Sequence, residues 1–259
     1  MPAKRKRSSQ RPSSTVAPAM RGVRMSVANS APQLKIDDEG RTVTGELGFR
    51  TARTAHGVKI GSWFCEARIL DPKKPNGHVR LGWTTSAGEI QAPVGYDEHS
   101  YGWRDVDGSK VQRSRRTAYG AGYKSGNVVG MLIRIVDPRA RAATTEGTTI
   151  EYFLDGVSQG IAFDNLPDQR YYPAVSLYMG AAVRMNFGPD FEFAPPQIGA
   201  KKKAGVESLE TGGASAADGT ADGAEPNVPA FPTRAAIARL WRPFCDVESS
   251  KVLGTIGRV

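Results

Sequence analysis

From residue 23 to residue 188 the chain alternates short apolar or aromatic runs with polar, glycine-containing turns. Runs of this kind are typical of β-strands, and this region contains no convincing helix. Asp155-Gly156, between residues 149–154 and 157–163, is a two-residue hairpin signal. Many short strands at regular spacing predict an all-β sandwich of two antiparallel sheets. The other predicted strands are residues 24–28, 34–36, 42–46, 61–70, 78–84, 100–104, 127–136, 174–179 and 182–188.

Large apolar side chains in these runs supply the predicted core. Trp83 and Trp103 are expected to pack inward, because large aromatic residues in strands are usually buried. The other residues expected in or near the core are Trp63, Phe64, Val129, Leu132, Ile133, Tyr152, Phe153, Val175, Leu177 and Phe187.

The composition changes at both ends of this region and predicts four segments. Residues 1–20 are a disordered basic tail, and residues 21–196 form the β-domain. Residues 197–230 are rich in Gly, Ala, Ser and Asp, so they are a disordered linker or insertion. Residues 231–259 are a C-terminal tail with a short amphipathic helix.

The predicted C-terminal helix covers residues 234–242, with Thr233 as its cap and Pro243 as its stop. Its apolar side chains lie three or four residues apart and form one stripe. A helix this short is marginal in water, so the stripe docks either on its own domain or on a partner. The residues of this candidate partner helix are Ile237, Leu240, Trp241 and Phe244.

The basic start of the chain and its composition predict the cellular compartment. The net charge is +9, and the basic patch Lys4, Arg5, Lys6 and Arg7 predicts a nuclear localisation signal, the alternative being a merely solvated tail. The chain has no apolar run near 18 residues and no apolar segment after its basic start. We therefore predict neither a membrane span nor a secretory signal.

Residue types that carry catalysis or bind metals are scattered. Cys65 and Cys245 lie 180 positions apart, and the histidines are His56, His78 and His99, so no structural zinc site is predicted. No nucleophile motif of the G-x-S-x-G type is present. We predict a protein without cofactor or metal that is not an enzyme.

Residues 80–104 hold the best candidate for a recognition site. Arg80 and Arg104 lie at or near strand positions on either side of a loop that contains Pro93, Gly95 and Tyr96. Arginine and tyrosine on a rigid scaffold are typical of a binding surface, because arginine pairs with carboxylates through two parallel hydrogen bonds.

Several motifs around this loop resemble one protein family. They are APQLKI at residues 31–36, QAPVGYDEHSYGWR at residues 91–104 and DGVSQGIAF at residues 155–163, with further matches out to residue 193. The chain resembles the SPRY (B30.2-like) domain of the Ash-two or Bre-two type of subunit in histone H3 lysine-4 methyltransferase complexes, the COMPASS and MLL assemblies.

The resemblance implies a non-catalytic nuclear scaffold subunit. Such a subunit binds an acidic segment of a retinoblastoma-binding-protein-five-type partner and so stimulates the SET-domain enzyme. Carried over by motif, the partner-binding residues are Phe49, Arg53, Arg80, Pro93, Tyr96 and Arg104. Phe49 stands where the family has a tyrosine, and Val106 stands where it has a lysine. The resemblance also implies a Dpy-thirty-type subunit that binds a helix of the C-terminal tail, whereas the candidate segment, residues 249–259, contains two glycines and is a poor helix.

Two other functions are kept as alternatives. One is a SPRY peptide receptor that serves as a ubiquitin-ligase substrate adaptor. The other is a basic nucleic-acid-binding protein, in which a strand over residues 110–116 would place Arg113 and Arg115 on one face. A charged edge strand explains the same arginines. The candidate contacts to nucleosomal DNA, expected to be weak, are Lys4, Arg5, Lys6, Arg7, Arg113, Arg115 and Arg116.

Overall fold

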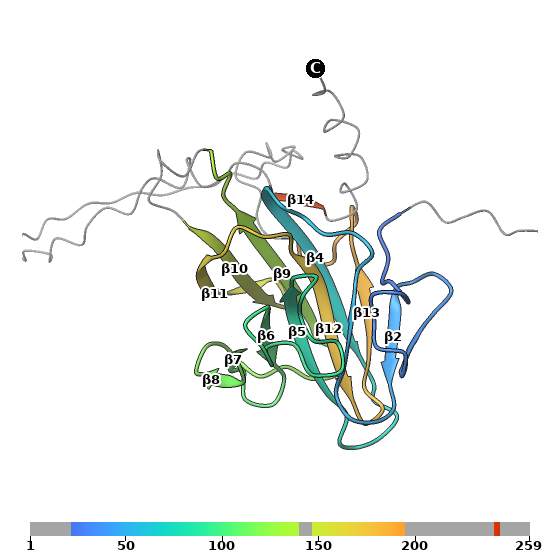
Figure 1. The fold of residues 1–259 in the computed structure, drawn as a ribbon. Helices are drawn as coiled ribbons and strands as arrows, with labels where there is room; N and C mark the ends of the chain where they lie inside the picture. The colour runs from blue at the N-terminus through green and yellow to red at the C-terminus, as the bar shows by residue number, and fades with distance from the viewer. Residues whose placement is uncertain (1–21, 140–146, 195–240, 244–259) are drawn as a thin grey trace, which may run out of the picture.

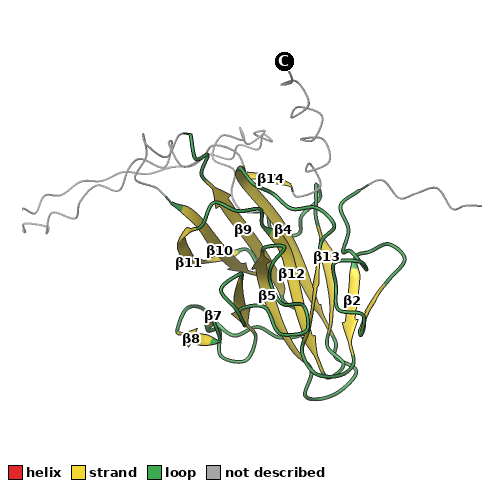
Figure 2. Cartoon of the chain, in the orientation of Figure 1, coloured by secondary structure: helices red, strands yellow, loops and turns green. Residues whose placement is uncertain are grey.

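The computed structural model describes residues 22–139, 147–194 and 241–243. Within these ranges all regular elements are strands, in two sheets that pack face to face (Figures 1 and 2). The described part of the chain has no helix that could cross a bilayer. The predicted all-β sandwich is therefore confirmed.

Apart from β14, every strand pairing is antiparallel. The first sheet runs in the order β1 (Leu34–Ile36), β2 (Thr42–Gly45), β13 (Ala182–Asn186), β4 (Gly61–Leu70), β9 (Val128–Ile135), β10 (Thr148–Leu154) and β11 (Val157–Leu166), with β14 (Trp241–Pro243) also against β4. The second sheet runs in the order β3 (Arg50–Arg53), β12 (Tyr172–Tyr178), β5 (His78–Thr84), β6 (Ser100–Arg104), β7 (Lys110–Gln112) and β8 (Arg115–Thr117).

The core lies between the sheets and is built by strand alternation. On β5, Val79, Leu81 and Trp83 are buried in it, while Arg80 is only partly buried. Trp103 on β6 is fully buried as well. All the residues predicted for the core are buried, although Phe64, Leu132 and Phe153 form a separate small cluster with Phe191.

One hairpin was predicted correctly from the sequence, whereas one strand was predicted wrongly and another was missed. The Asp155-Gly156 hairpin between β10 and β11 is confirmed, and both residues have positive φ, at 47° and 82°. The prediction of a strand at residues 24–28 was wrong, because only Met25 makes a bridge, to Thr54. Residues 50–53 were not predicted as a strand, since the sequence Arg-Thr-Ala-Arg has no apolar run. Their edge position in the second sheet lets polar side chains face outward.

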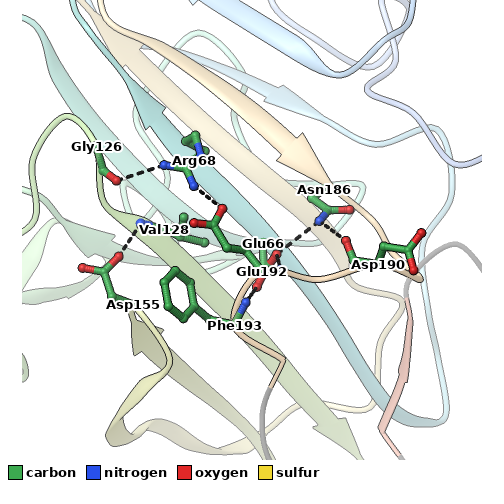
Figure 3. Close-up of polar contacts among 9 residues, drawn as sticks. All are labelled: Glu66, Arg68, Gly126, Val128, Asp155, Asn186, Asp190, Glu192 and Phe193. Atoms are coloured by element: carbon green, nitrogen blue, oxygen red, sulfur yellow. Dashed lines mark hydrogen bonds and ion pairs between the residues drawn. The ribbon is translucent and has the colours of Figure 1, made fainter.

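Buried Glu66 on β4 fastens the chain after β13 to the outer face of the first sheet (Figure 3). Its carboxylate accepts hydrogen bonds from the backbone N–H groups of Glu192 (3.0 Å) and Phe193 (2.7 Å). The side-chain amide of Asn186 donates to it as well, at 3.2 Å. Arg68 pairs with the Glu192 carboxylate beside it. This strap brings Phe191 onto Phe64, with ring centroids 4.9 Å apart.

The end of the predicted C-terminal helix is corrected by β14. Most of residues 234–242 lie outside the described residues, as do Ile237, Leu240 and Phe244, but Trp241 and Arg242 belong to a strand. β14 runs parallel to β4 along Ser62 to Phe64, just beyond the point where β13 stops pairing at Glu66. A residue before proline is biased toward extended backbone, which favours a strand at Arg242-Pro243 over the end of a helix.

Candidate functional site

The loop between β5 and β6, residues 85–99, folds back over the outer face of the second sheet. Three hydroxyl groups on that face anchor it. Ser176 Oγ accepts a hydrogen bond from Val94 N at 2.7 Å, and Ser100 Oγ accepts one from Gly95 N at 2.9 Å. Thr51 Oγ1 donates to Ala92 O at 2.6 Å. Small polar side chains on β3, β12 and β6 therefore position the loop.

A tight turn at the centre of this loop displays Tyr96. Tyr96 N donates to Pro93 O at 3.0 Å, and Gly95 between them has φ of 90°. A glycine at this third position is what a type II turn requires. The turn leaves Tyr96 52% exposed.

Arg80 and Arg104 face each other across paired strands beside this loop. They are register partners in the β5–β6 ladder, and Ser176 pairs with Arg80 from the other side. The Arg80 guanidinium carbon lies 5.0 Å from the centroid of the Phe49 ring. Phe49 in turn stacks on Tyr178, with centroids 5.0 Å apart. We call the surface formed by Phe49, Arg80, Pro93, Tyr96, Arg104 and Tyr178 the arginine–aromatic surface.

The electrostatics of this surface favour an anion. Arg80 Nε is buried and has no hydrogen-bond acceptor among the described residues. Burial lowers the pKa of Arg80, and the neighbouring positive charges of Arg104 and Arg116 lower it further. A buried cation beside two others is costly unless a negative group pairs with it. The site therefore has positive charge available for a carboxylate.

Acidic residues after β6 neutralise only part of this charge. Asp107 pairs with Arg104 at 2.6 Å, and its carboxyl also accepts hydrogen bonds from Ser109. Asp105 Oδ2 accepts from Val79 N and lies 3.0 Å from His78 Nδ1, and the negative charge of Asp105 offsets part of the lowering of the Arg80 pKa. Val106 between them is 54% exposed.

Arg53 has a different environment from the other residues predicted for the site. Its Nη1 donates to Thr85 O at 2.7 Å, at the start of the loop. Burial lowers the pKa of this guanidinium. Arg53 therefore helps to hold the loop in place through one of its five N–H groups.

Sequence reasoning missed two neighbours of Arg80. Tyr178 supports Phe49, and the ring of His78 lies 6.1 Å from Tyr178 in a stacked arrangement. Alternation along β12 was a usable signal for Tyr178, because it shares a face with Ser176. Alternation was also a usable signal for His78, which lies two residues before Arg80 on the predicted strand 78–84. Its stacking on Tyr178 depends on the pairing of β5 with β12.

The basic residues at 110–116 do not form one strand. They form a hairpin in which Arg113 and Ser114 occupy the turn with φ of 50° and 60°. The prediction that Arg113 and Arg115 share a strand face was therefore wrong. Both residues, with Lys110, line a groove of ≈ 630 Å³ against β11, and Arg113 pairs with Glu98 at 3.0 Å.

The remaining predicted sites fall elsewhere. Lys4, Arg5, Lys6 and Arg7 lie outside the described residues. Within residues 22–139, 147–194 and 241–243, no cluster of His, Cys, Asp or Glu has the composition of a metal site. The arrangement of the arginine–aromatic surface suits the binding of an acidic ligand.

Comparison with known proteins agrees with this fold and these motifs. The SPRY domain family model matches residues 62–190. The chain is 32% identical over 216 residues to the Set1/Ash2 histone methyltransferase complex subunit ASH2 of Drosophila melanogaster, covering 70% of this chain and 38% of that protein. It is also 32% identical over 216 residues to the Set1/Ash2 histone methyltransferase complex subunit ash-2 of Caenorhabditis elegans, covering 67% of this chain and 37% of that protein.

The chain thus spans less than two-fifths of the length of these two relatives. Among solved structures, the SPRY domain of human HERC1 has a TM-score of 0.51 at 16% identity. That likeness covers 62% of this chain and 96% of the HERC1 chain, and it supports the fold. The sandwich, the loop motifs and the similarity to Ash2 subunits lead to one assignment: the chain belongs to the SPRY-domain family and carries the Ash2-type form of the domain.

Proposed function

We propose that this protein is a non-catalytic scaffold subunit of a nuclear histone H3 lysine-4 methyltransferase complex. Its arginine–aromatic surface binds an acidic segment of a retinoblastoma-binding-protein-five-type subunit. The pair then holds the SET-domain enzyme in its active arrangement and increases the rate of histone methylation. Two relatives named as subunits of Set1/Ash2 complexes support this assignment.

The observation that carries the proposal is that Arg80 and Arg104 lie directly opposite each other in the backbone register of the adjacent strands β5 and β6. Backbones of adjacent strands lie about 5 Å apart, so one carboxylate reaches both guanidiniums. Arg80 is already held over Phe49 and lacks an acceptor among the described residues. Little side-chain entropy is then lost when an anion binds, which favours affinity.

Phe49 and Tyr96 supply the apolar part of the surface. Phe49 packs between Arg80 and Tyr178, and this packing needs no hydroxyl group. The exposed ring of Tyr96 can contact an apolar residue that lies next to the acidic group of the ligand. We therefore expect the ligand to combine carboxylates with at least one large apolar side chain.

Other contacts of the proposed complex are secondary. Lys4, Arg5, Lys6 and Arg7 support nuclear import and weak, sequence-independent contact with nucleosomal DNA. A Dpy-thirty-type subunit is a further candidate partner of the C-terminal tail. No membrane association is proposed.

The decisive test removes both arginines of the pair. The full chain is titrated calorimetrically with a synthetic peptide of the candidate partner's acidic segment. We expect Arg80→Ala/Arg104→Ala to weaken binding by about 30-fold to 1,000-fold. A central arginine at an interface contributes roughly 2 kcal/mol, or about 30-fold, and the contributions of two neighbouring arginines add only in part. The same variant is expected to lose its stimulation of a reconstituted SET-domain complex.

A matched control removes two guanidiniums from the outer face of the other sheet, in Arg68→Ala/Arg184→Ala. These residues lie on β4 and β13, away from the loop, and the control is expected to bind and stimulate like the unaltered chain. Equal binding and equal stimulation by all three proteins would exclude the proposed site.

Asp107 offers a change in the opposite direction. Its ion pair with Arg104 competes with any incoming carboxylate. We expect Asp107→Asn to tighten binding of the acidic peptide about twofold to fivefold, the range of a partly exposed ion pair. Asp38→Asn, an exposed acid outside the site, serves as the control. Weaker binding by Asp107→Asn in the same titration would mean that Asp107 orients Arg104 for the ligand.

A further inference from the structure

The β7–β8 hairpin directs its consecutive arginines to opposite sides. Arg115 pairs with Gln112, and both line the groove against β11. In the backbone register, Arg116 lies opposite Val111, and Val111 lies opposite Gly102 on β6. Successive side chains of a strand point to opposite faces, so Arg116 shares a face with Val111.

Val111 identifies which face this is. A Cβ on Gly95, in the loop of the arginine–aromatic surface, would lie 2.9 Å from Val111 Cβ. Gly102 also faces this loop, because a Cβ there would lie 2.7 Å from Val94 O. Val111 therefore packs beneath the loop, and Arg116 emerges on the outer face of the sheet with Arg104.

The hairpin is also tied directly to Tyr96 and its neighbours. Ser114 N donates to Gly95 O at 2.9 Å, and Arg113 N donates to Asp97 O at 3.0 Å. Ser114 Oγ donates to Tyr96 O at 2.9 Å. Hairpin and loop therefore form one connected surface. The pKa of Arg80 is lowered mainly by burial and by the charge of Arg104, and the charge of Arg116 contributes to the same shift.

We propose that Arg116 is a third arginine of the anion-binding site, which then takes an acidic peptide that carries at least two carboxylate groups. The proposal rests on the proposed function of the Arg80–Arg104 pair. One carboxylate binds between Arg80 and Arg104, and the other binds Arg116, whose strand lies about 10 Å from β6 along the sheet. Arg116 is exposed, so its guanidinium is accessible to a ligand.

The segment that follows β6 also makes a third arginine useful to an acidic ligand. Residues 105–107 carry no positive charge, because the exposed Val106 lies between Asp105 and Asp107. Arg116, on the second strand from β6, supplies positive charge to the same face of the sheet. The ligand's second acidic group is therefore expected over the hairpin.

Charge substitutions at 116 and 115 test the proposal, because these neighbours are both exposed arginines on one strand. The full-length chain is titrated with the acidic peptide at low and at physiological salt. We expect Arg116→Ala to weaken binding about threefold to tenfold and Arg116→Glu more than tenfold, with both losses shrinking as salt rises. Arg115→Ala and Arg115→Glu should stay within about twofold of the unaltered chain.

The outcomes separate the two proposals. If Arg80→Ala/Arg104→Ala loses binding while the Arg116 and Arg115 variants behave alike, the third arginine is excluded and the proposed function stands. If the unaltered chain does not bind the acidic peptide, both are overturned. Thermal unfolding of each variant, expected to match the unaltered chain, shows that the exposed substitutions leave the fold intact.

Discussion

Trp103→Ala is expected to lower the free energy of unfolding by about 3–5 kcal/mol, as truncation of a buried aromatic side chain does. Trp103 on β6 is fully buried, and its Nε1 donates to Gly108 O at 3.0 Å. Its ring lies 4.9 Å from the ring of Tyr123 and 5.4 Å from that of Tyr152, measured between centroids. Alanine would leave a cavity beside these two rings and would remove one of the two hydrogen bonds to Gly108 O, which also accepts from Gly120 N at 3.0 Å.

The tyrosines around Trp103 make this site hard to repack. Tyr123 donates its hydroxyl to Trp103 O at 2.8 Å, and Tyr152 donates to Tyr101 O at 3.0 Å. Burial raises the pKa of both hydroxyls, so they remain protonated donors at neutral pH. Such anchored rings cannot move freely into the space that the indole vacates.

Urea denaturation of the full chain measures the loss. Tyr96→Ala is the control, since it truncates an aromatic residue that is 52% exposed, and it should change the free energy of unfolding by no more than about 0.5 kcal/mol. A loss below about 1 kcal/mol for Trp103→Ala would show that this part of the core is not closely packed.

Gly82→Ala is expected to destabilise the fold by about 3 kcal/mol or more, because its methyl group meets backbone. A Cβ at Gly82 would lie 1.9 Å from Tyr101 O and 2.9 Å from Tyr152 Oη. These two atoms form the hydrogen bond that joins the tyrosine cluster to the second sheet. The strands β5 and β6 would have to separate, and the Arg80–Arg104 pair would separate with them.

A substitution at Gly48 provides the comparison. A Cβ there would meet only the end of the Arg50 side chain, at 3.7 Å, so Gly48→Ala is expected to be tolerated. For Gly82→Ala we expect a lower urea midpoint together with weaker binding of the acidic peptide. Unaltered stability would mean that β5 and β6 relax around the methyl group at little cost.

Much of the β-sandwich follows from the local alternation of apolar and polar residues and from turn motifs. Alternation along residues 78–84 placed Trp83 inward and Arg80 outward, and Asp155-Gly156 placed the β10–β11 hairpin. Strands without an apolar run could not be predicted from the sequence. Arg50–Arg53 and Arg115–Thr117 are edge strands without an apolar run. Arg50–Arg53 pairs with β12, which is distant in sequence, and Arg115–Thr117 pairs with β7 in a short hairpin.

The sequence by itself determined the fold class, the core and the two arginines that flank one loop, because these follow from strand alternation and residue type. Only the tertiary structure decided where the other arginines lie. Arg53 donates to Thr85 O, Arg115 lines the groove against β11, and Arg116 lies on the face of the second sheet that carries Val111 and Gly102. The physical reason is that a guanidinium's role depends on the strand beside it, and that neighbour is chosen by sheet pairing across the whole chain.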